Sequence, residues 1–597
     1  MATTAFKSPE VHWNLNDLFS GISDPRIEQN LSRQKQRAEE FAKKYRGRIN
    51  APGLTAEGLA AAIAEYESLS QESGKPAQFA SLLFATNSKD PQIGAFMQKM
   101  QEKGTELSII LMFFELELLA VDESVMARLL ADPKLKTYQH YITTARAFRE
   151  HTMSEPEEKV MEELANTGGR AFSRLFTEVT SNATFKVENS GGATEELTQP
   201  EVLARLSHPD REIRRRAAEG FTAGLRENNR VLTFVFNTLL QDKATRDRLR
   251  KHQSPEESRH LANELDHPTV ETVVCAVERN ADMVARYYRL KRKILNLPEL
   301  THYDRYAPLF DSEERISWDE GRKIVIDALG EFSPVLKDRA DEFFTGNWID
   351  AQARPGKRGG AFCSYITPDL HPYVMVNYLG KMDDVSTLAH ELGHGVHASL
   401  SRGQSYFNFH GTLPLAELAS TFAEMLVFEK LQKRASPKDR LALFADKIEG
   451  AFATIFRQSV MYRFEQDIHR HRREQGELTP EQFGDYWQAR QQSMFKDSVV
   501  LGEDHKMWWS YIPHFIGSPF YVYAYSFGEL LVMALFQQYK RKGGAFADEY
   551  VTLLRKGGSL SPRELMQSVG IDIKDPAFWQ GGLDVLGGMV TEFEKMQ

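Results

Sequence analysis

The chain has 597 residues, of which 42% are apolar and 26% are charged, and its net charge is -9. A chain of this length can bury a large core and is expected to form more than one domain, at roughly 100–200 residues each. A small acidic excess of mixed charges gives no sign of a basic surface for nucleic acid or for an anionic membrane. We therefore expect neither nucleic acid nor a membrane among its partners.

The cysteine content, the N-terminal segment and the length of the longest apolar run indicate the cellular compartment. Cys275 and Cys363 are the only cysteines, which is too few for a disulfide framework or a cysteine-built zinc site. The N-terminal segment has no apolar core of a secretory signal. The longest apolar run, residues 107–121, is too short for a bilayer span and contains two glutamates. The sequence therefore predicts a cytoplasmic protein.

Helical periodicity dominates the chain. Apolar residues recur at helical spacing over residues 55–69, and similar patterns follow at 211–220, 436–475 and 545–554. Strand-like segments are few: one at 185–189, and one at 373–378. We predict a mainly α protein with one small sheet. A Gly/Ser/Thr-rich stretch at 189–200 suggests a boundary between an N-terminal helical domain, residues 1–200, and a domain of residues 201–597 that carries the chemistry.

The pentapeptide HELGH at 390–394 is the strongest chemical signal. On a helix, His390 and His394 share one face and can ligate one zinc ion. Glu391 can then act as general base on a zinc-bound water. An apolar stripe over residues 385–396, with Asp383 or Asp384 as N-cap, favours a helix here. The alternative is two histidines on an ordinary helix, because the bare pentapeptide occurs by chance in roughly a few per cent of chains of this length.

A third ligand is predicted downstream. The segment after Thr412 begins another helix, in which Glu417 and Glu424 lie seven residues apart among apolar neighbours. A carboxylate on a second helix completes a His2Glu catalytic zinc site, so we assign Glu417 as ligand and Glu424 as its supporting neighbour. An exposed acidic stripe is the alternative, which the apolar flanks disfavour. His397 is expected to hydrogen-bond near the site rather than to ligate.

An aromatic segment at 514–528 holds candidate transition-state groups. His514, Tyr521, Tyr523 and Tyr525 are close in sequence, and imidazole or hydroxyl donors can stabilise negative charge on a carbonyl oxygen. Pro519 can start a helix, on which Tyr521 and Tyr525 share a face while Tyr523 turns away. An aromatic core stripe is the alternative.

Several extended motifs together resemble the oligoendopeptidase F branch of the thimet-type zinc oligopeptidases. They are WNLNDLF at 13–19, YDRYAPL at 303–309, GGAF at 359–362, TLAHELGHGVH at 387–397 and ELASTFAE at 417–424. The motifs extend over most of the chain and are far more specific than the pentapeptide alone.

The resemblance implies a zinc-dependent metalloendopeptidase that hydrolyses internal bonds of short oligopeptides, with one Zn²⁺ per chain on His390, His394 and Glu417 and with Glu391 as base. It implies a two-lobed helical body around a deep channel, with the small sheet beside the zinc-binding helix. It also implies that His514 and one or two of the tyrosines at 521, 523 and 525 contact substrate. The strand at 373–378 would be an edge strand that pairs with the substrate backbone.

Two other readings remain open. An exopeptidase on a similar helical scaffold would need a charged group to hold a substrate terminus, and the sequence does not locate one. A non-catalytic peptide-binding scaffold is disfavoured by the complete set of metal ligands and base.

Overall fold

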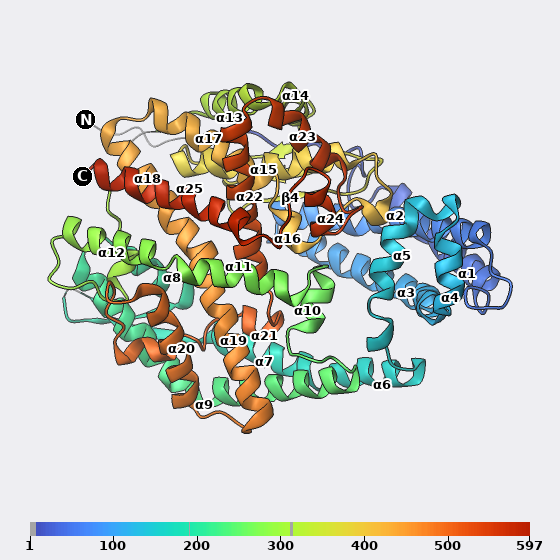
Figure 1. Ribbon diagram of the computed structural model, residues 1–597, viewed down its shortest axis with the longest axis horizontal. Helices are drawn as coiled ribbons and strands as arrows, with labels where there is room; N and C mark the ends of the chain where they lie inside the picture. The colour runs from blue at the N-terminus through green and yellow to red at the C-terminus, as the bar shows by residue number, and fades with distance from the viewer. Residues whose placement is uncertain (1–7, 190, 311–314) are drawn as a thin grey trace. The chain divides into compact units, whose positions relative to one another are not determined.

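The computed structural model describes residues 8–189, 191–310 and 315–597 (Figure 1). Packing divides the chain into two compact units. Unit 1 comprises Met1–Arg149, Glu314–Arg434 and Gln538–Asp572. Unit 2 comprises Glu150–Glu313, Ala435–Gln537 and Ile573–Gln597. The sequence boundary expected at residue 200 falls inside unit 2, because each unit is assembled from three separate stretches of chain.

Unit 1 begins with three long helices that pack on one another. They are α1 (Pro25–Tyr45), α2 (Ala56–Thr86) and α3 (Pro91–Ala120). Asp24, Thr55 and Asp90 accept backbone hydrogen bonds at their N-termini, which satisfies amides that have no partner within a helix. Their apolar faces meet in a core that includes Phe41 and Phe114. The shorter α4 (Glu123–Leu130) and α5 (Gln139–Arg146) complete this part.

The rest of unit 1 combines helices with a three-stranded sheet. Strands β3 (Ile349–Asp350), β5 (Tyr373–Met375) and β4 (Phe362–Ser364) lie in that order, with β3 parallel and β4 antiparallel to β5. The helices are α13 (Trp318–Phe332), α14 (Pro334–Thr345), α15 (Met382–Ser401), α16 (Leu413–Ala416), α17 (Ser420–Arg434), α23 (Ala545–Arg555) and α24 (Pro562–Gln567). Strands β4 and β5 contact α15, so the predicted small sheet beside the motif helix is confirmed.

The sheet corrects one expectation about its edge. The segment 373–378 was expected to be an edge strand, but β5 is the central strand. Beyond β5, the amides of Val376 and Tyr378 continue to donate to Asp350 and Ala351 on the β3 side. Strand β4 has a strand neighbour on one side only. Strand β3 is the other edge, but the carbonyl of Val11 in the N-terminal segment accepts from the amides of Ala351 and Gln352 directly after it, so it is β4 that offers an edge for an added strand.

Unit 2 is built around the 39-residue helix α9 (Arg211–Leu249). Strand β1 (Thr184–Glu188) pairs antiparallel with β2 (Thr194–Thr198) and packs on α9. The first predicted strand is thus confirmed, and the Gly/Ser/Thr-rich stretch forms the second half of a hairpin. Gly220 and Gly224 allow this approach, because a Cβ atom on Gly220 would lie 2.5 Å from the carbonyl oxygen of Lys186.

Further helices surround α9 in unit 2. Those before it are α6 (Glu155–Ala165), α7 (Gly169–Asn182) and α8 (Gln199–Arg205). Those after it are α10 (Glu257–Ala262), α11 (His267–Arg279), α12 (Asp282–Ile294), α18 (Pro437–Ala451), α19 (Arg457–Glu474), α20 (Pro480–Phe495), α21 (His514–Gly517), α22 (Tyr523–Lys542, which continues into unit 1) and α25 (Pro576–Lys595). The predicted mainly α fold is confirmed. Across the described residues, no helix combines the length and the apolar character that a bilayer span requires.

Candidate metal centre

Helix α15 carries the HELGH motif and is packed closely on the segment that supplies the third ligand. A Cβ atom on Gly393 would lie 2.5 Å from the carbonyl oxygen of Ala419, and one on Gly395 would lie 2.4 Å from the ring of Phe343. Glycine at both positions therefore lets α15 approach its neighbours. The helix begins at Met382, after Lys381. Of the two aspartates considered as N-cap, Asp384 reaches back from the first turn and accepts from the amides of Leu379 and Lys381.

The three predicted ligands come together in unit 1. Nε2 of His390 lies 3.2 Å and Nε2 of His394 lies 3.5 Å from Oε2 of Glu417. The two imidazole rings are 4.9 Å apart at an angle of 81°. Atoms that each bind a tetrahedral zinc ion at about 2.0–2.2 Å lie roughly 3.3–3.5 Å from one another. The donor set and its spacing therefore fit a zinc ion.

Glu417 does not lie on a continuous helix as expected. It follows α16, and the chain turns over residues 417–419 before α17 begins at Ser420. Three contacts hold this turn: the Ser420 hydroxyl donates to Oε2 of Glu417 at 2.7 Å, the Tyr550 hydroxyl donates to the carbonyl of Leu418 at 2.6 Å, and the backbone packs against Gly393. The turn separates Glu417 from Glu424, so the two carboxylates approach His390 from different points.

Glu424 supports His390 from the side opposite to Glu417. Its Oε1 lies 2.5 Å from Nδ1 of His390, as a carboxylate does when it orients a metal-binding histidine. Burial alone would lower the pKa of His390. Its hydrogen bonds to Glu417 and Glu424 outweigh the effect of burial, so the pKa is raised to about 10. Burial alone would raise the pKa of Glu417, yet the hydrogen bond from His390 and the charge of His394 bring it to about 2. Burial lowers the pKa of His394 to about 4. The low pKa values of Glu417 and His394 suit an ionised carboxylate and a neutral imidazole as ligands, whereas His390 must release its Nε2 proton when it binds an ion.

Glu391 lies beside the ligands but outside the ligand group. Its side chain is buried, and burial raises its pKa to about 7, with the negative charges of Glu417 and Glu424 adding and His390 opposing. A carboxylate whose pKa lies near neutral can both accept and return a proton at the same pH. This is the property that a general base in peptide hydrolysis needs.

A group of residues that sequence reasoning missed lines the same region. The ring of Tyr365, just after β4, stacks on His410 at 4.5 Å and lies 6.5 Å from the ring of His394. Burial, with the charges of nearby acidic groups, raises the pKa of Tyr365 well above its usual value, so it is a neutral hydroxyl. Only its position three residues after the GGAF motif could have indicated it. His397 packs against this ring at 6.4 Å, but its buried Nδ1 has no hydrogen-bond partner among the described residues, contrary to expectation.

The aromatic candidates all belong to unit 2. The ring of His514 lies 6.2 Å from Tyr521 and 5.9 Å from Tyr525, and the two tyrosine rings are 4.8 Å apart. Burial, together with the charge of Arg457, lowers the pKa of His514, so its imidazole is neutral at pH 7. The structure therefore brings these three side chains together.

Tyr523 differs from the other two tyrosines. It is 1% exposed, and its hydroxyl accepts from Nδ2 of Asn263 at 2.8 Å and lies 3.1 Å from Nδ1 of His260. The expected helix start at Pro519 is also wrong, because α22 begins at Tyr523 after Phe520 adopts φ 58°. Tyr523 is a core residue, and we leave it out of the candidate site.

A mainly helical fold that brings two histidines and a glutamate together at metal-binding distances, with a second buried glutamate beside them, is typical of helical metallopeptidases. The model of peptidase family M3 matches residues 204–585, and that of the oligopeptidase F N-terminal region matches 117–185. The chain belongs to peptidase family M3, and its resemblance to the oligoendopeptidase F branch is confirmed.

Individual relatives align over nearly the full chain. Oligopeptidase PepF of Bacillus subtilis is 26% identical over 98% of this chain and 87% of its own length. The chromosomal oligoendopeptidase F of Lactococcus lactis is 26% identical over 98% of this chain and 97% of its own length.

Solved structures share the fold. A protein of Chlamydophila abortus has a TM-score of 0.87 at 22% identity, with 98% of each chain covered. Oligoendopeptidase-F of Enterococcus faecium has a TM-score of 0.72 at 20% identity, with 96% of this chain and 98% of that chain covered.

Proposed function

We propose that this metallopeptidase is a zinc-dependent endopeptidase that cleaves internal bonds of short oligopeptides. The observation that carries the proposal is the convergence of His390, His394 and Glu417 at distances suited to one zinc ion, with Glu391 beside them and outside the ligand set. Relatives named oligoendopeptidase F support the substrate class. We propose one zinc ion per chain.

A zinc ion held by these three ligands would act as a Lewis acid and lower the pKa of water. The chain's own groups then supply proton transfer and positioning. Glu391, buried beside the ligands, takes the proton of the attacking water at its carboxylate and returns it to the leaving amine. Glu424 holds the Nδ1 hydrogen of His390, so that Nε2 faces Glu417.

Substrate backbone is proposed to pair with strand β4. Its free edge can accept an extended peptide, and backbone pairing is largely independent of side chains. Cys363 on this strand and Tyr365 just beyond it lie close enough to Glu391 for its charge to raise their pKa values, in addition to the larger effect of burial. This proximity supports a substrate strand on β4 beside Glu391.

His514, Tyr521 and Tyr525 are the proposed donors to the substrate carbonyl or its oxyanion. A neutral imidazole and two hydroxyls can each donate one hydrogen bond. Their mutual contacts in unit 2 support a common role.

The decisive experiment uses internally quenched peptides blocked at both ends, with products identified by mass spectrometry. An endopeptidase cleaves them internally, a strong chelator abolishes cleavage, and added Zn²⁺ restores it. Folded proteins are expected to stay intact. If blocked peptides are untouched while free-ended peptides lose terminal residues, the chain is an exopeptidase. If no peptide is cleaved by zinc-loaded protein, it is a binding scaffold.

A further inference from the structure

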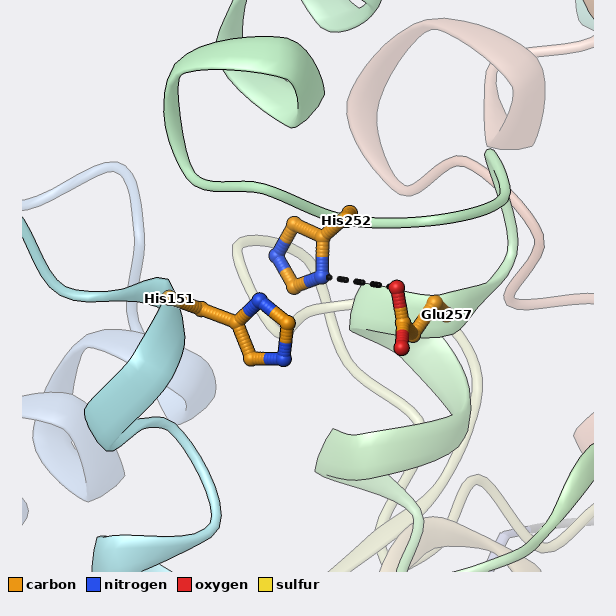
Figure 2. A group of neighbouring side chains, drawn as sticks. All are labelled: His151, His252 and Glu257. Carbon is orange, nitrogen blue, oxygen red and sulfur yellow. Dashed lines mark ion pairs between the residues drawn. The ribbon is translucent and has the colours of Figure 1, made fainter.

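A second group of potential metal ligands lies in unit 2, in residues that the proposed function does not use (Figure 2). His151 ends the short helix η2 (Arg149–His151), His252 follows α9, and Glu257 begins α10. One ligand atom from each residue lies within 4.8 Å of the others. Figure 2 shows the two imidazole rings facing one another, with the Glu257 carboxylate next to the His252 ring.

His252 presents an unsatisfied buried nitrogen to this point. Its side chain is 3% exposed, and Nδ1 has no hydrogen-bond partner among the described residues. That Nδ1 atom lies 3.5 Å from Oε2 of Glu257. Two atoms that bind the same zinc ion at about 2.0–2.2 Å are separated by roughly 3.3–3.5 Å. A buried polar atom without a partner points to a missing ligand, and the spacing here fits a metal ion.

The other two groups are oriented by neighbouring backbone. Nδ1 of His151 lies 2.9 Å from the carbonyl oxygen of Arg250. Because a carbonyl can only accept, Nδ1 carries the hydrogen and Nε2 keeps its lone pair, as in metal-binding histidines. The backbone amide of Gln253 donates to Oε2 of Glu257 and fixes that carboxylate beside His252. Both ligands thus have the supporting contacts that metal sites require.

Ligation of one ion by both histidines requires a change in the arrangement of their rings. The rings of His151 and His252 stack at 4.0 Å with 13° between their planes. The lone pairs of the ring nitrogens lie in two nearly parallel ring planes, so the partly exposed His151 ring must turn out of the stack to share an ion with Nδ1 of His252, and in doing so it exchanges its contact with the Arg250 carbonyl.

We propose that His151, His252 and Glu257 form a second divalent-metal site that takes Zn²⁺. Two imidazoles and one carboxylate are ligands that zinc accepts, and water completes the tetrahedron. The ion would join η2 to the loop after α9. These segments are 99 residues apart at His151 and Arg250, and Arg250 already links them by donating to the carbonyl of His151 and to Glu158. The proposed ion would therefore stabilise the fold of unit 2 by linking these two segments.

The test measures zinc in full-length protein in which His390→Ala and His394→Ala have removed the proposed catalytic centre. After dialysis against micromolar Zn²⁺, bound zinc is counted by mass spectrometry. We expect about one ion per chain and a higher melting temperature with zinc than without. This background separates the outcome from that of the proposed function, which can fail or hold independently.

Further substitutions in that background assign the ligands. His252→Ala should lower zinc affinity at least about 100-fold, beyond the effect of losing a supporting contact, and should remove the zinc-dependent rise in melting temperature. Glu257→Gln keeps the shape of the side chain and serves if His252→Ala does not fold. His267→Gln, at an exposed histidine of the same unit, should change neither. A background protein that is folded but binds no zinc, or variants at 252 and 257 that bind it as before, would overturn the proposal.

Discussion

Nδ1 of His390 and Oε1 of Glu424 are 2.5 Å apart, across the contact between α15 and α17. The hydrogen bond fixes the ring so that Nε2 is directed to Glu417, at 3.2 Å. The motif histidine is therefore positioned by a residue 34 positions further along the chain.

Glu424→Gln should weaken zinc binding without abolishing it. The variant keeps the size of the side chain but loses the negative charge that favours the Nδ1 hydrogen of His390, so affinity should fall about 10- to 100-fold. Competition with a chromogenic chelator measures this. Glu429→Gln on the same helix, which removes an ion pair with Lys540, should leave zinc affinity unchanged. Equal effects of the two variants would show that helix stability, not ligand orientation, is responsible.

Glu391→Gln and Glu417→Ala should separate proton transfer from metal binding. The first should keep about one zinc ion per chain and lower kcat about 100- to 10,000-fold, because the base is lost and the ligands remain. The second should lose zinc, because a ligand is removed. Metal content and peptide hydrolysis are measured on the same preparations. Loss of zinc from Glu391→Gln would mean that these roles are exchanged.

Substitutions of Tyr521, Tyr523 and Tyr525 should have two different effects, one on catalysis and one on stability. Tyr521→Phe or Tyr525→Phe is expected to lower kcat, by up to about 100- to 1,000-fold if the hydroxyl donates to the oxyanion, with little change in melting temperature. Tyr523→Phe should instead destabilise the fold by about 1–3 kcal/mol, since the buried amide of Asn263 loses its acceptor. Thermal unfolding and steady-state kinetics on the three variants decide. A Tyr523→Phe enzyme that is stable and inactive contradicts the assignment.

Glu465 should make the stability of the protein fall as pH rises. It is fully buried, its Oε1 accepts from the amide of Phe520 at 2.7 Å, and burial raises its pKa from 4.5 to about 8. Between these values the unfolded chain has lost the proton that the folded protein keeps, so stability contributed by the neutral carboxyl declines from pH 4.5 to pH 8.

Glu465→Gln, which cannot ionise, should remove this component. The melting temperature of the variant relative to the parent should therefore increase from pH 5 to pH 8. Glu481→Gln, at an exposed glutamate in the first turn of α20, is the matched control. A constant difference between Glu465→Gln and the parent across this range would contradict the buried neutral carboxyl.

The sequence by itself determined the helical fold and the candidate metal ligands. Both are local: apolar residues at helical spacing predict a helix, and a four-residue separation puts His390 and His394 on one face. Glu417 and Glu424 were found from their residue type among apolar neighbours, although the chain turns between them. Such patterns can be predicted because they depend mainly on residues that are close in sequence.

Tertiary structure decided what depends on contacts between distant segments. Strand order made β4 the edge and β5 the centre, which period-two patterns do not reveal because they describe one strand at a time. Helical spacing predicted that Tyr523 turns away from Tyr521 and Tyr525, but only the packing shows that it meets His260 and Asn263 in the core. No sequence pattern indicated His151 or Glu257 as a ligand, because only packing brings η2 to the loop after α9. Side chains that are brought together only by tertiary packing leave no local pattern in the sequence.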